Sequence, residues 1–164
     1  MNVAITDANI FIDLHSLDIL ESIFSLDFEF HTTQEVIDEL EDDQIEELTR
    51  ISVAGHIEIH VLTPEELEEL QNLDVSPGLS NTDRSIIICT QKVESMVLTG
   101  DMKLRHTLQE SGIEVHGILW VFDEMISAEI ITEENAANLL ESLMEINTWL
   151  PFTVCRERID SWRN

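Results

Sequence analysis

Five short strand-like segments alternate with helix-forming segments along the chain, and this alternation limits the fold more than any other feature of the sequence. The expected strands cover residues 3–7, 28–31, 57–61, 96–99 and 113–117. The expected helices cover residues 10–14, 17–26, 34–41, 65–73, 82–92, 102–111, 118–127 and 133–147, with a further acidic helix reaching residue 51 and a short basic one after Pro151. Strands that alternate with helices form a mostly parallel sheet covered on both faces, so the pattern predicts an α/β fold.

The third expected strand alternates strictly between apolar and polar residues, as is typical of a half-exposed strand at a sheet edge. If it lies at an edge, the strand order 3-2-1-4-5 places the first and fourth strands side by side. The chain reverses its winding direction between these two strands, and ligands bind at such a point beyond the carboxyl ends of the strands. Asp7 follows the first strand and Asp101 follows the fourth, so both carboxylates are expected at the same crevice.

The charge of the chain is uneven, with 8 Lys and Arg against 34 Asp and Glu and a formal net charge of −26. Fourteen of the acids, but only one base, Arg50, lie between residues 34 and 74. Such a surface repels phosphates at long range and attracts cations or basic proteins, which counts against a nucleic-acid function. The 43% hydrophobic content is ordinary for a folded chain, and we expect one domain over residues 1–164, with a core at 1–125 and C-terminal helices at 126–164.

The cysteine and histidine content favours neither a secreted protein nor a zinc protein. Cys89 and Cys155 are too few for a disulfide framework, and a zinc site would need clustered Cys or His. The chain opens on a strand-like segment, without the basic and apolar regions of a signal peptide. Since no apolar run approaches the roughly 18–20 residues that span a bilayer, we expect a cytoplasmic protein without a membrane segment.

Asp7 and Asp101 each stand between an apolar strand and a helix. Either acid alone is explained by capping of the helix that follows it, because Asp is favoured at helix N-caps. Two such acids at adjacent strand ends would still lie close together, and their mutual repulsion would call for a cation. The pair therefore indicates a divalent metal site more strongly than either member does.

Two further acids are expected to complete this site. Asp83 stands three residues after Ser80, which matches a capping box, but a first-turn acid on an apolar helix can both cap and ligate. In the helix that begins at residue 34, Glu39 flanks the apolar arc and can reach inward. Glu35 lies on the same flank but fits a capping box with Thr32, so Glu39 is favoured as the functional acid.

These residues resemble the motifs of the PIN-domain nucleases. The matching segments are Asp7-Ala8-Asn9, Val36-Ile37-Asp38-Glu39-Leu40, Leu79-Ser80-Asn81-Thr82-Asp83, Val97-Leu98-Thr99-Gly100-Asp101-Met102-Lys103-Leu104-Arg105, and the strand Gly112-Ile113-Glu114-Val115-His116-Gly117. They stand in the right order over roughly residues 1–125. The resemblance implies a three-layer α/β/α fold with a five-stranded parallel sheet of order 3-2-1-4-5.

The resemblance also implies a hydrolase: a metal-dependent ribonuclease such as the VapC-type toxins of toxin–antitoxin pairs. Mg²⁺ or Mn²⁺ would be held by carboxylate oxygens and would activate the water that attacks the phosphodiester. By this analogy Asp7, Asp83 and Asp101 are the expected metal ligands and catalytic residues, with Glu39 completing the site or orienting the water. The weaker candidates are Asn9, Glu35, Thr99, Lys103 and Arg105.

The implied partners are RNA as substrate, a basic antitoxin-like protein and a second copy of the chain. The charge supports a second hypothesis, a PIN-like module without nuclease activity whose acidic face docks a basic partner. A haloacid-dehalogenase-like phosphatase is disfavoured, because its motif needs a second Asp where this chain has Asn9.

Overall fold

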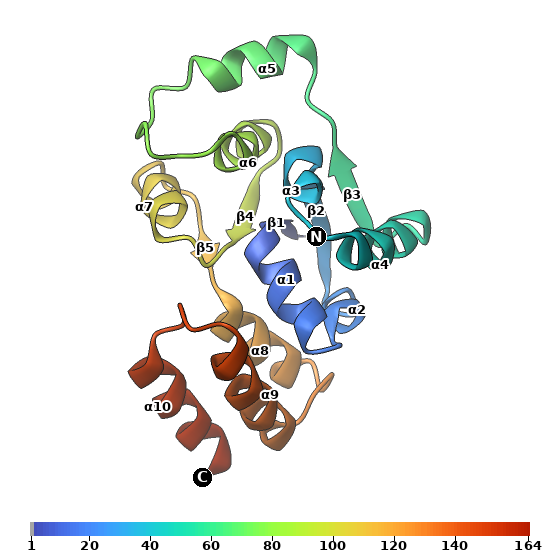
Figure 1. The fold of residues 1–164 in the computed structure, drawn as a ribbon, viewed down its shortest axis with the longest axis vertical. Coiled ribbons are helices and arrows are strands. Elements are labelled where there is room, and N and C mark those ends of the chain that lie inside the picture. The colour runs from blue at the N-terminus through green and yellow to red at the C-terminus, as the bar shows by residue number, and fades with distance from the viewer. Residues whose placement is uncertain (1) are drawn as a thin grey trace.

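The computed structural model describes residues 2–164 and contains a five-stranded sheet in the order β3-β2-β1-β4-β5 (Figure 1). The strands are β1 (Asn2–Thr6), β2 (Phe28–Thr33), β3 (Ile57–His60), β4 (Ser95–Leu98) and β5 (Val115–His116). Every neighbouring pair is parallel. The expected order is confirmed, with β3 at an edge and β1 beside β4.

Helices cover both faces of this sheet. They are α1 (Ala8–Ser16), α2 (Leu20–Ile23), α3 (Gln34–Asp38), α4 (Asp42–Val53), α5 (Pro64–Gln71), α6 (Asn81–Lys92), α7 (Met102–Glu110), α8 (Ile118–Ser127), α9 (Glu133–Ile146) and α10 (Phe152–Arg163). Helix α6 packs on β1 and β2 and contacts α3 and α5, whereas α1 contacts α2 and α4, and α4 contacts β3. The result is the three-layer α/β/α arrangement that the sequence predicted, with α8, α9 and α10 grouped beside it (Figure 1).

Several elements differ in length from the prediction. The helix expected at 17–26 is reduced to α2, because Asp18 adopts a φ of 58°, which right-handed helices exclude. Helix α3 ends at Asp38, since Glu41 forms the capping box of a separate helix, α4. Strand β5 has only two residues, and α10 is a full helix of 12 residues rather than a short one.

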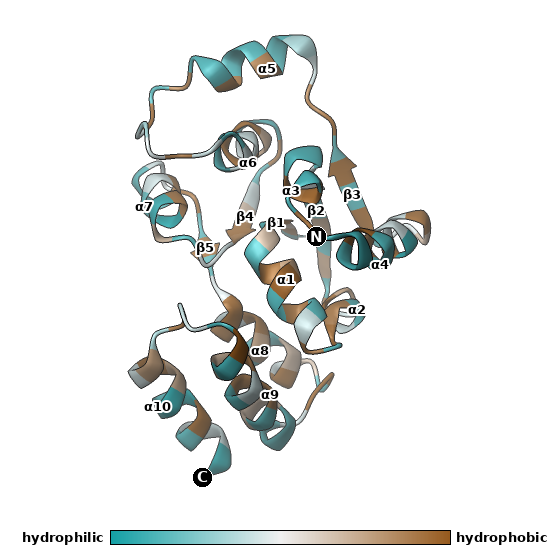
Figure 2. Cartoon of the chain, viewed as in Figure 1, coloured by the Kyte–Doolittle hydropathy of each residue, from teal (hydrophilic) through white to brown (hydrophobic). Residues whose placement is uncertain are grey.

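One apolar core joins the sheet to the helices. Figure 2 shows the brown, hydrophobic residues on the strands and on α1 and α8, whereas α5 is mostly teal. Cys89 is buried within α6, as predicted. Within residues 2–164, none of the helices has the length and apolar character of a membrane span.

The basic residues near the C-terminus are engaged within the group of helices α8, α9 and α10. Arg156 and Arg163 of α10 both bind Glu141 of α9, with nitrogen–oxygen distances of 3.3 and 2.5 Å. Arg158 pairs with Asp123 of α8. These three guanidinium groups therefore neutralise acids of their own bundle.

The packing of α1 positions the first acidic motif, so its core residues are expected to control stability. Leu14 of α1 is 0% exposed, and Leu14→Ala should lower the free energy of unfolding by about 2–5 kcal/mol because it leaves a cavity. Ile12 of the same helix is 38% exposed, and Ile12→Ala should cost about 1 kcal/mol or less. Urea unfolding of both variants measures this difference. Equal losses of the free energy of unfolding in the two variants would contradict this packing.

Candidate metal centre

Asp7 lies directly after β1 and is only 4% exposed. It is the N-cap of α1, and its Oδ1 accepts a hydrogen bond of 2.7 Å from the backbone N–H of Ala8. Its backbone N–H donates to the carbonyl oxygen of Leu98 on β4, at 2.9 Å. The capping role and the position between β1 and β4 therefore coexist in one residue, and neither excludes the other.

The hydroxyl of Thr99 connects the ends of β1 and β4. Thr99 Oγ1 donates a hydrogen bond of 2.7 Å to Asp7 Oδ2 and accepts one of 3.1 Å from the backbone N–H of Asp101. Asn9 adds a second connection, because its Nδ2 donates to Asp7 Oδ2 at 3.2 Å and its Oδ1 accepts from the N–H of Gly100 at 2.9 Å. The structure thus brings Asp7, Asn9, Thr99 and Asp101 together at the carboxyl ends of β1 and β4, where the strand order predicts the ligand crevice.

Asp101 and Asp83 enter the crevice from the first turns of two helices. Asp101 is half-buried as the N-cap of α7, where its Oδ1 accepts from the N–H of Leu104 at 2.9 Å. Asp83 forms the expected capping box of α6 with Ser80, in which each side chain accepts from the other's backbone N–H. In both cases the cap fixes the carboxylate at the start of its helix.

Glu39 lies just beyond the end of α3, as its C-cap, and is exposed. Its Oε1 accepts a hydrogen bond of 2.8 Å from Thr82 Oγ1, which ties it to the residue preceding Asp83. Glu35 is half-buried, and its Oε2 has no hydrogen-bond partner among residues 2–164. The position of Glu39 beside α6 favours it over Glu35 at this crevice.

The charges of these acids act on one another. Burial raises the pKa of Asp7 from its ordinary value of 3.8 to about 6, hydrogen bonds from Thr99 and Ala8 oppose this rise, and the charges of Asp83 and Glu39 add to it. Burial also raises the pKa of Asp83, against the bonds from Ser80, and the charges of Asp101 and Glu39 raise it further. The crevice therefore concentrates negative charge that a cation would neutralise.

The donor atoms suit a hard divalent ion. In the described part of the chain, no three of the four expected acids bring carboxylate oxygens within 4.8 Å of one another. These acids are Asp7, Glu39, Asp83 and Asp101. A Mg²⁺ site does not require three carboxylates to converge, because Mg²⁺ keeps several waters and is bound directly by only one or two carboxylates. Asp7, Asp83, Asp101 and Glu39 supply oxygen donors alone, as Mg²⁺ and Mn²⁺ prefer.

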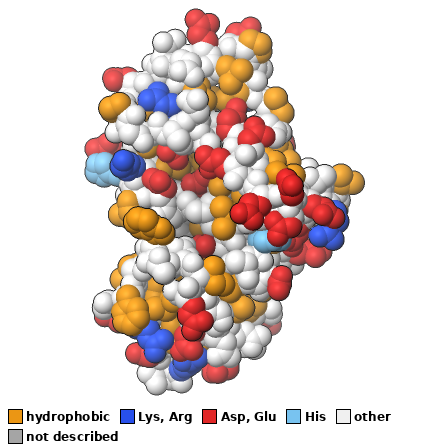
Figure 3. All heavy atoms as spheres, in the orientation of Figure 1, with side chains coloured by type: hydrophobic (Ala, Val, Ile, Leu, Met, Phe, Trp, Pro, Cys, Tyr) orange, Lys and Arg blue, Asp and Glu red, His pale blue; other side chains and the backbone are white. Residues whose placement is uncertain are grey.

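Two basic residues of α7 lie beside the crevice. Arg105 Nη2 donates to the carbonyl oxygen of Thr99 at 3.5 Å. Lys103 is exposed, and a Cβ added at Gly78 would lie 3.2 Å from its Nζ, which places the ammonium against the loop before α6. Figure 3 shows acidic side chains across the middle of this face, with Lys and Arg nearer its margins.

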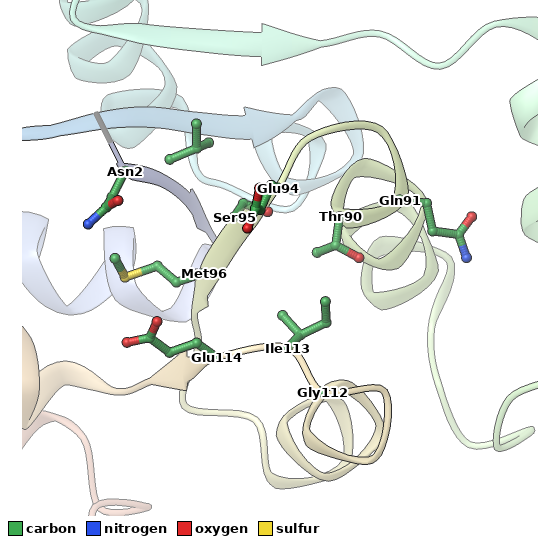
Figure 4. Close-up of a pocket in the computed structure, with 10 residues that line it drawn as sticks. Asn2, Thr90, Gln91, Glu94, Ser95, Met96, Gly112, Ile113 and Glu114 are labelled. Carbon is green, nitrogen blue, oxygen red and sulfur yellow. The ribbon is translucent and has the colours of Figure 1, made fainter.

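A hollow of about 770 Å³ lies at the opposite end of the sheet from the carboxylates (Figure 4). Its lining includes Asn2 and Ser95, the first residues of β1 and β4, together with Glu94 and Glu114. Since ligands of such sheets bind beyond the carboxyl ends of the strands, this hollow is not the candidate site.

Sequence reasoning missed a second group of metal-binding side chains, His31, Glu58 and His60, on β2 and β3. One ligand atom from each lies within 4.8 Å of the others. The signal was the repetition of Glu-x-His on both strands, Glu29-Phe30-His31 and Glu58-Ile59-His60. No zinc site was expected from the sequence, and this group was overlooked because pairing of the two strands brings distant residues together.

The raised pKa of Asp7 predicts a pH-dependent stability in the absence of metal. A carboxyl whose pKa is higher in the folded chain stabilises it below about pH 4, and this contribution is lost as the pH rises through about 6. The loss amounts to about 3 kcal/mol at most. Asp7→Asn has no carboxyl to ionise at this position. Its free energy of unfolding, relative to that of wild type, should therefore increase from pH 4 to pH 8.

Urea unfolding in EDTA at pH 4, 6 and 8 measures this difference. The matched control is Asp38→Asn, because Asp38 is exposed and should give the same difference from wild type at every pH. If the free energies of unfolding of Asp7→Asn and wild type differ by the same amount at every pH, the pKa of Asp7 is not raised in the folded chain.

The comparison with protein families agrees with the motifs. The model of a family described as DUF3368, PIN domain, matches residues 3–164. A solved structure of a PilT N-terminus domain protein, SSO1118, from the hyperthermophilic archaeon Sulfolobus solfataricus P2 is similar at 11% identity and a TM-score of 0.46, over 73% of this chain and 89% of that chain. No curated protein matches. PIN domains are typically metal-dependent nucleases, and this chain belongs to the PIN-domain family.

Proposed function

We propose that this PIN domain is a Mg²⁺- or Mn²⁺-dependent endoribonuclease whose metal is held by Asp7, Asp83 and Asp101, directly or through bound waters, with Glu39 completing the site. The observation that carries the proposal is the Thr99 hydroxyl, which bonds the Asp7 carboxylate and the backbone of Asp101 at once. It supports a single site built from acids that lie far apart in the sequence.

The chain's own residues would act mainly by positioning. When bound, a divalent ion polarises a phosphodiester oxygen and lowers the pKa of a water. Thr99 and Asn9 hold the buried Asp7 carboxylate in one orientation. Glu39 is exposed at the mouth of the crevice, where its second carboxylate oxygen can accept a proton from an attacking water.

The acidic surface limits how RNA would bind. Each Lys or Arg contact with a phosphate releases counterions and strengthens binding. Four of the eight basic residues are paired with acids: Lys92, Arg156, Arg158 and Arg163. Lys103 and Arg105, on the α7 side of the crevice, are the cations placed to meet a phosphate backbone. We therefore expect weak, salt-sensitive binding that depends on the metal.

Cleavage of a diverse RNA pool with Mn²⁺ tests the proposal. Wild type should cleave in Mn²⁺ and stop in EDTA. Asp101→Asn keeps an N-cap residue on α7 but removes a ligand charge. Because loss of a partner that only orients a ligand costs 10–100-fold, Asp101→Asn should cleave at least about 100-fold more slowly.

Asp38→Asn serves as the control for a change of one surface charge, since Asp38 is exposed and its bonding partner within residues 2–164 is Gln34 alone. It should cleave as wild type does. Cleavage of equal rate in Asp101→Asn would reveal a contaminating nuclease, and a wild type that binds Mn²⁺ but cleaves no RNA would reject the nuclease proposal.

A wild type that binds Mn²⁺ but cleaves no RNA would favour the hypothesis that the acidic face docks a basic protein. The acids of α5 available to a basic partner are Glu65, Glu68 and Glu69, all of them exposed. A partner whose binding survives neutralisation of these residues would exclude docking on this face. The toxin-like role, the antitoxin partner and the homodimer stay predictions from the family resemblance.

A further inference from the structure

Two histidines from neighbouring strands face each other on one side of the sheet. His31 of β2 is 3% exposed, and its Nδ1 lies 2.7 Å from Nε2 of His60 on β3. Residue 31 pairs with Glu58 in the strand register, and Thr33 pairs with His60, so these side chains share a face. Thr33 is bonded to Ser85 of α6, which identifies this face as the one that α6 covers.

The contact with Glu29 indicates which nitrogen of His31 carries the proton when this ring is neutral. His31 Nε2 lies 2.9 Å from Glu29 Oε1, so this nitrogen donates to the carboxylate. A neutral His31 then has an unprotonated Nδ1, and His60 must donate its Nε2 proton to it. A carboxylate that holds one ring nitrogen while the other points at a shared site is the arrangement found around metal-ligating histidines.

Glu58 supplies a third donor at the same place. Its carboxylate oxygens lie 3.7 Å from His31 Nε2 and 3.9 Å from His60 Nε2. The Glu58 side chain is 62% exposed, so it closes the group on the solvent side and can turn toward an ion.

We propose that His31 Nδ1, His60 Nε2 and the carboxylate of Glu58 bind a divalent transition-metal ion of the zinc class, separate from the carboxylate crevice, with Glu29 orienting His31. Two imidazoles and one carboxylate match the ligand types of zinc, and a fourth position stays open to water. The same donor set disfavours Mg²⁺, which prefers oxygen alone.

Binding requires only small rearrangements. On entry of the ion the Nε2 proton of His60 moves to Nδ1 of the same ring, and the ion takes its place between the two rings. With zinc–nitrogen bonds of about 2.0–2.1 Å, the two nitrogens have to separate by about half an ångström. His60 lies on the edge strand β3 and can shift more readily than the buried His31.

The surroundings of His60 favour the neutral form of its ring. Burial lowers the pKa of His60, and a proton added to His31 and the charge of Lys92 lower it further, against the opposite effects of Glu58 and Glu66. A neutral imidazole is the form that binds metal. The ion would join the edge strand β3 to β2 through side chains, in addition to the backbone hydrogen bonds that already pair the two strands.

Calorimetric titration with Zn²⁺ in excess Mg²⁺ tests the proposal on the full chain. Wild type should bind one Zn²⁺ tightly and gain thermal stability from it. His60→Gln should lose this binding, and Glu29→Gln should weaken it about 10–100-fold. The control is His106→Gln, which changes an exposed histidine whose partner among the described residues is Glu110. It should bind Zn²⁺ as wild type does.

Asp7→Asn separates this site from the carboxylate crevice and should leave the Zn²⁺ affinity unchanged. The visible absorption spectrum of bound Co²⁺ gives a second readout, independent of calorimetry. Wild type should show the bands of a four-coordinate nitrogen–oxygen site, and His60→Gln should lack them. If His60→Gln does not fold, Glu58→Gln takes its place, since Glu58 is exposed. Absence of Zn²⁺ binding, equal binding in these variants, or loss of binding in Asp7→Asn would overturn the proposal.

Discussion

The hydrogen bonds of the Thr99 hydroxyl hold the candidate metal centre together. One oxygen atom donates to the buried carboxylate of Asp7 and accepts from the backbone of Asp101, so it fixes the end of β1 against the end of β4. The parallel pairing of these two strands brings the three residues into register. The other two acids are placed separately, Asp83 by its capping box with Ser80 and Glu39 by its bond from Thr82.

Helix capping and metal binding make the same demand on these acids. Asp7 and Asp101 cap α1 and α7, and Asp83 completes the capping box of α6. An acid can cap a helix from its start, and in this fold the starts of three helices converge near the carboxyl ends of β1 and β4. The capping explanation considered from the sequence is therefore correct for each residue and leaves the shared site intact. The cost of the arrangement appears in the raised pKa values of Asp7 and Asp83.

The strand order and the placement of the acids were predictable because they follow from local patterns. An apolar run, an acid and a helix occur in succession twice, and the strictly alternating third strand lies at the edge as expected. The end of α3 at Asp38 rather than near residue 41 was not predictable from periodicity, because Glu41 belongs to the capping box of α4. The contact between His31 and His60 depends on strand register, which a single strand pattern does not specify.

The net charge of −26 and the proposed nuclease activity can coexist if the cation is part of the binding surface. Titration of the Asp7 carboxyl carbon by NMR, with and without saturating Mg²⁺, tests this most directly. We predict that the pKa of the Asp7 carboxyl is near 6 in EDTA and falls toward or below the ordinary 3.8 when Mg²⁺ is added. A carboxyl that titrates near 3.8 under both conditions would contradict a crowded carboxylate site that requires a metal ion.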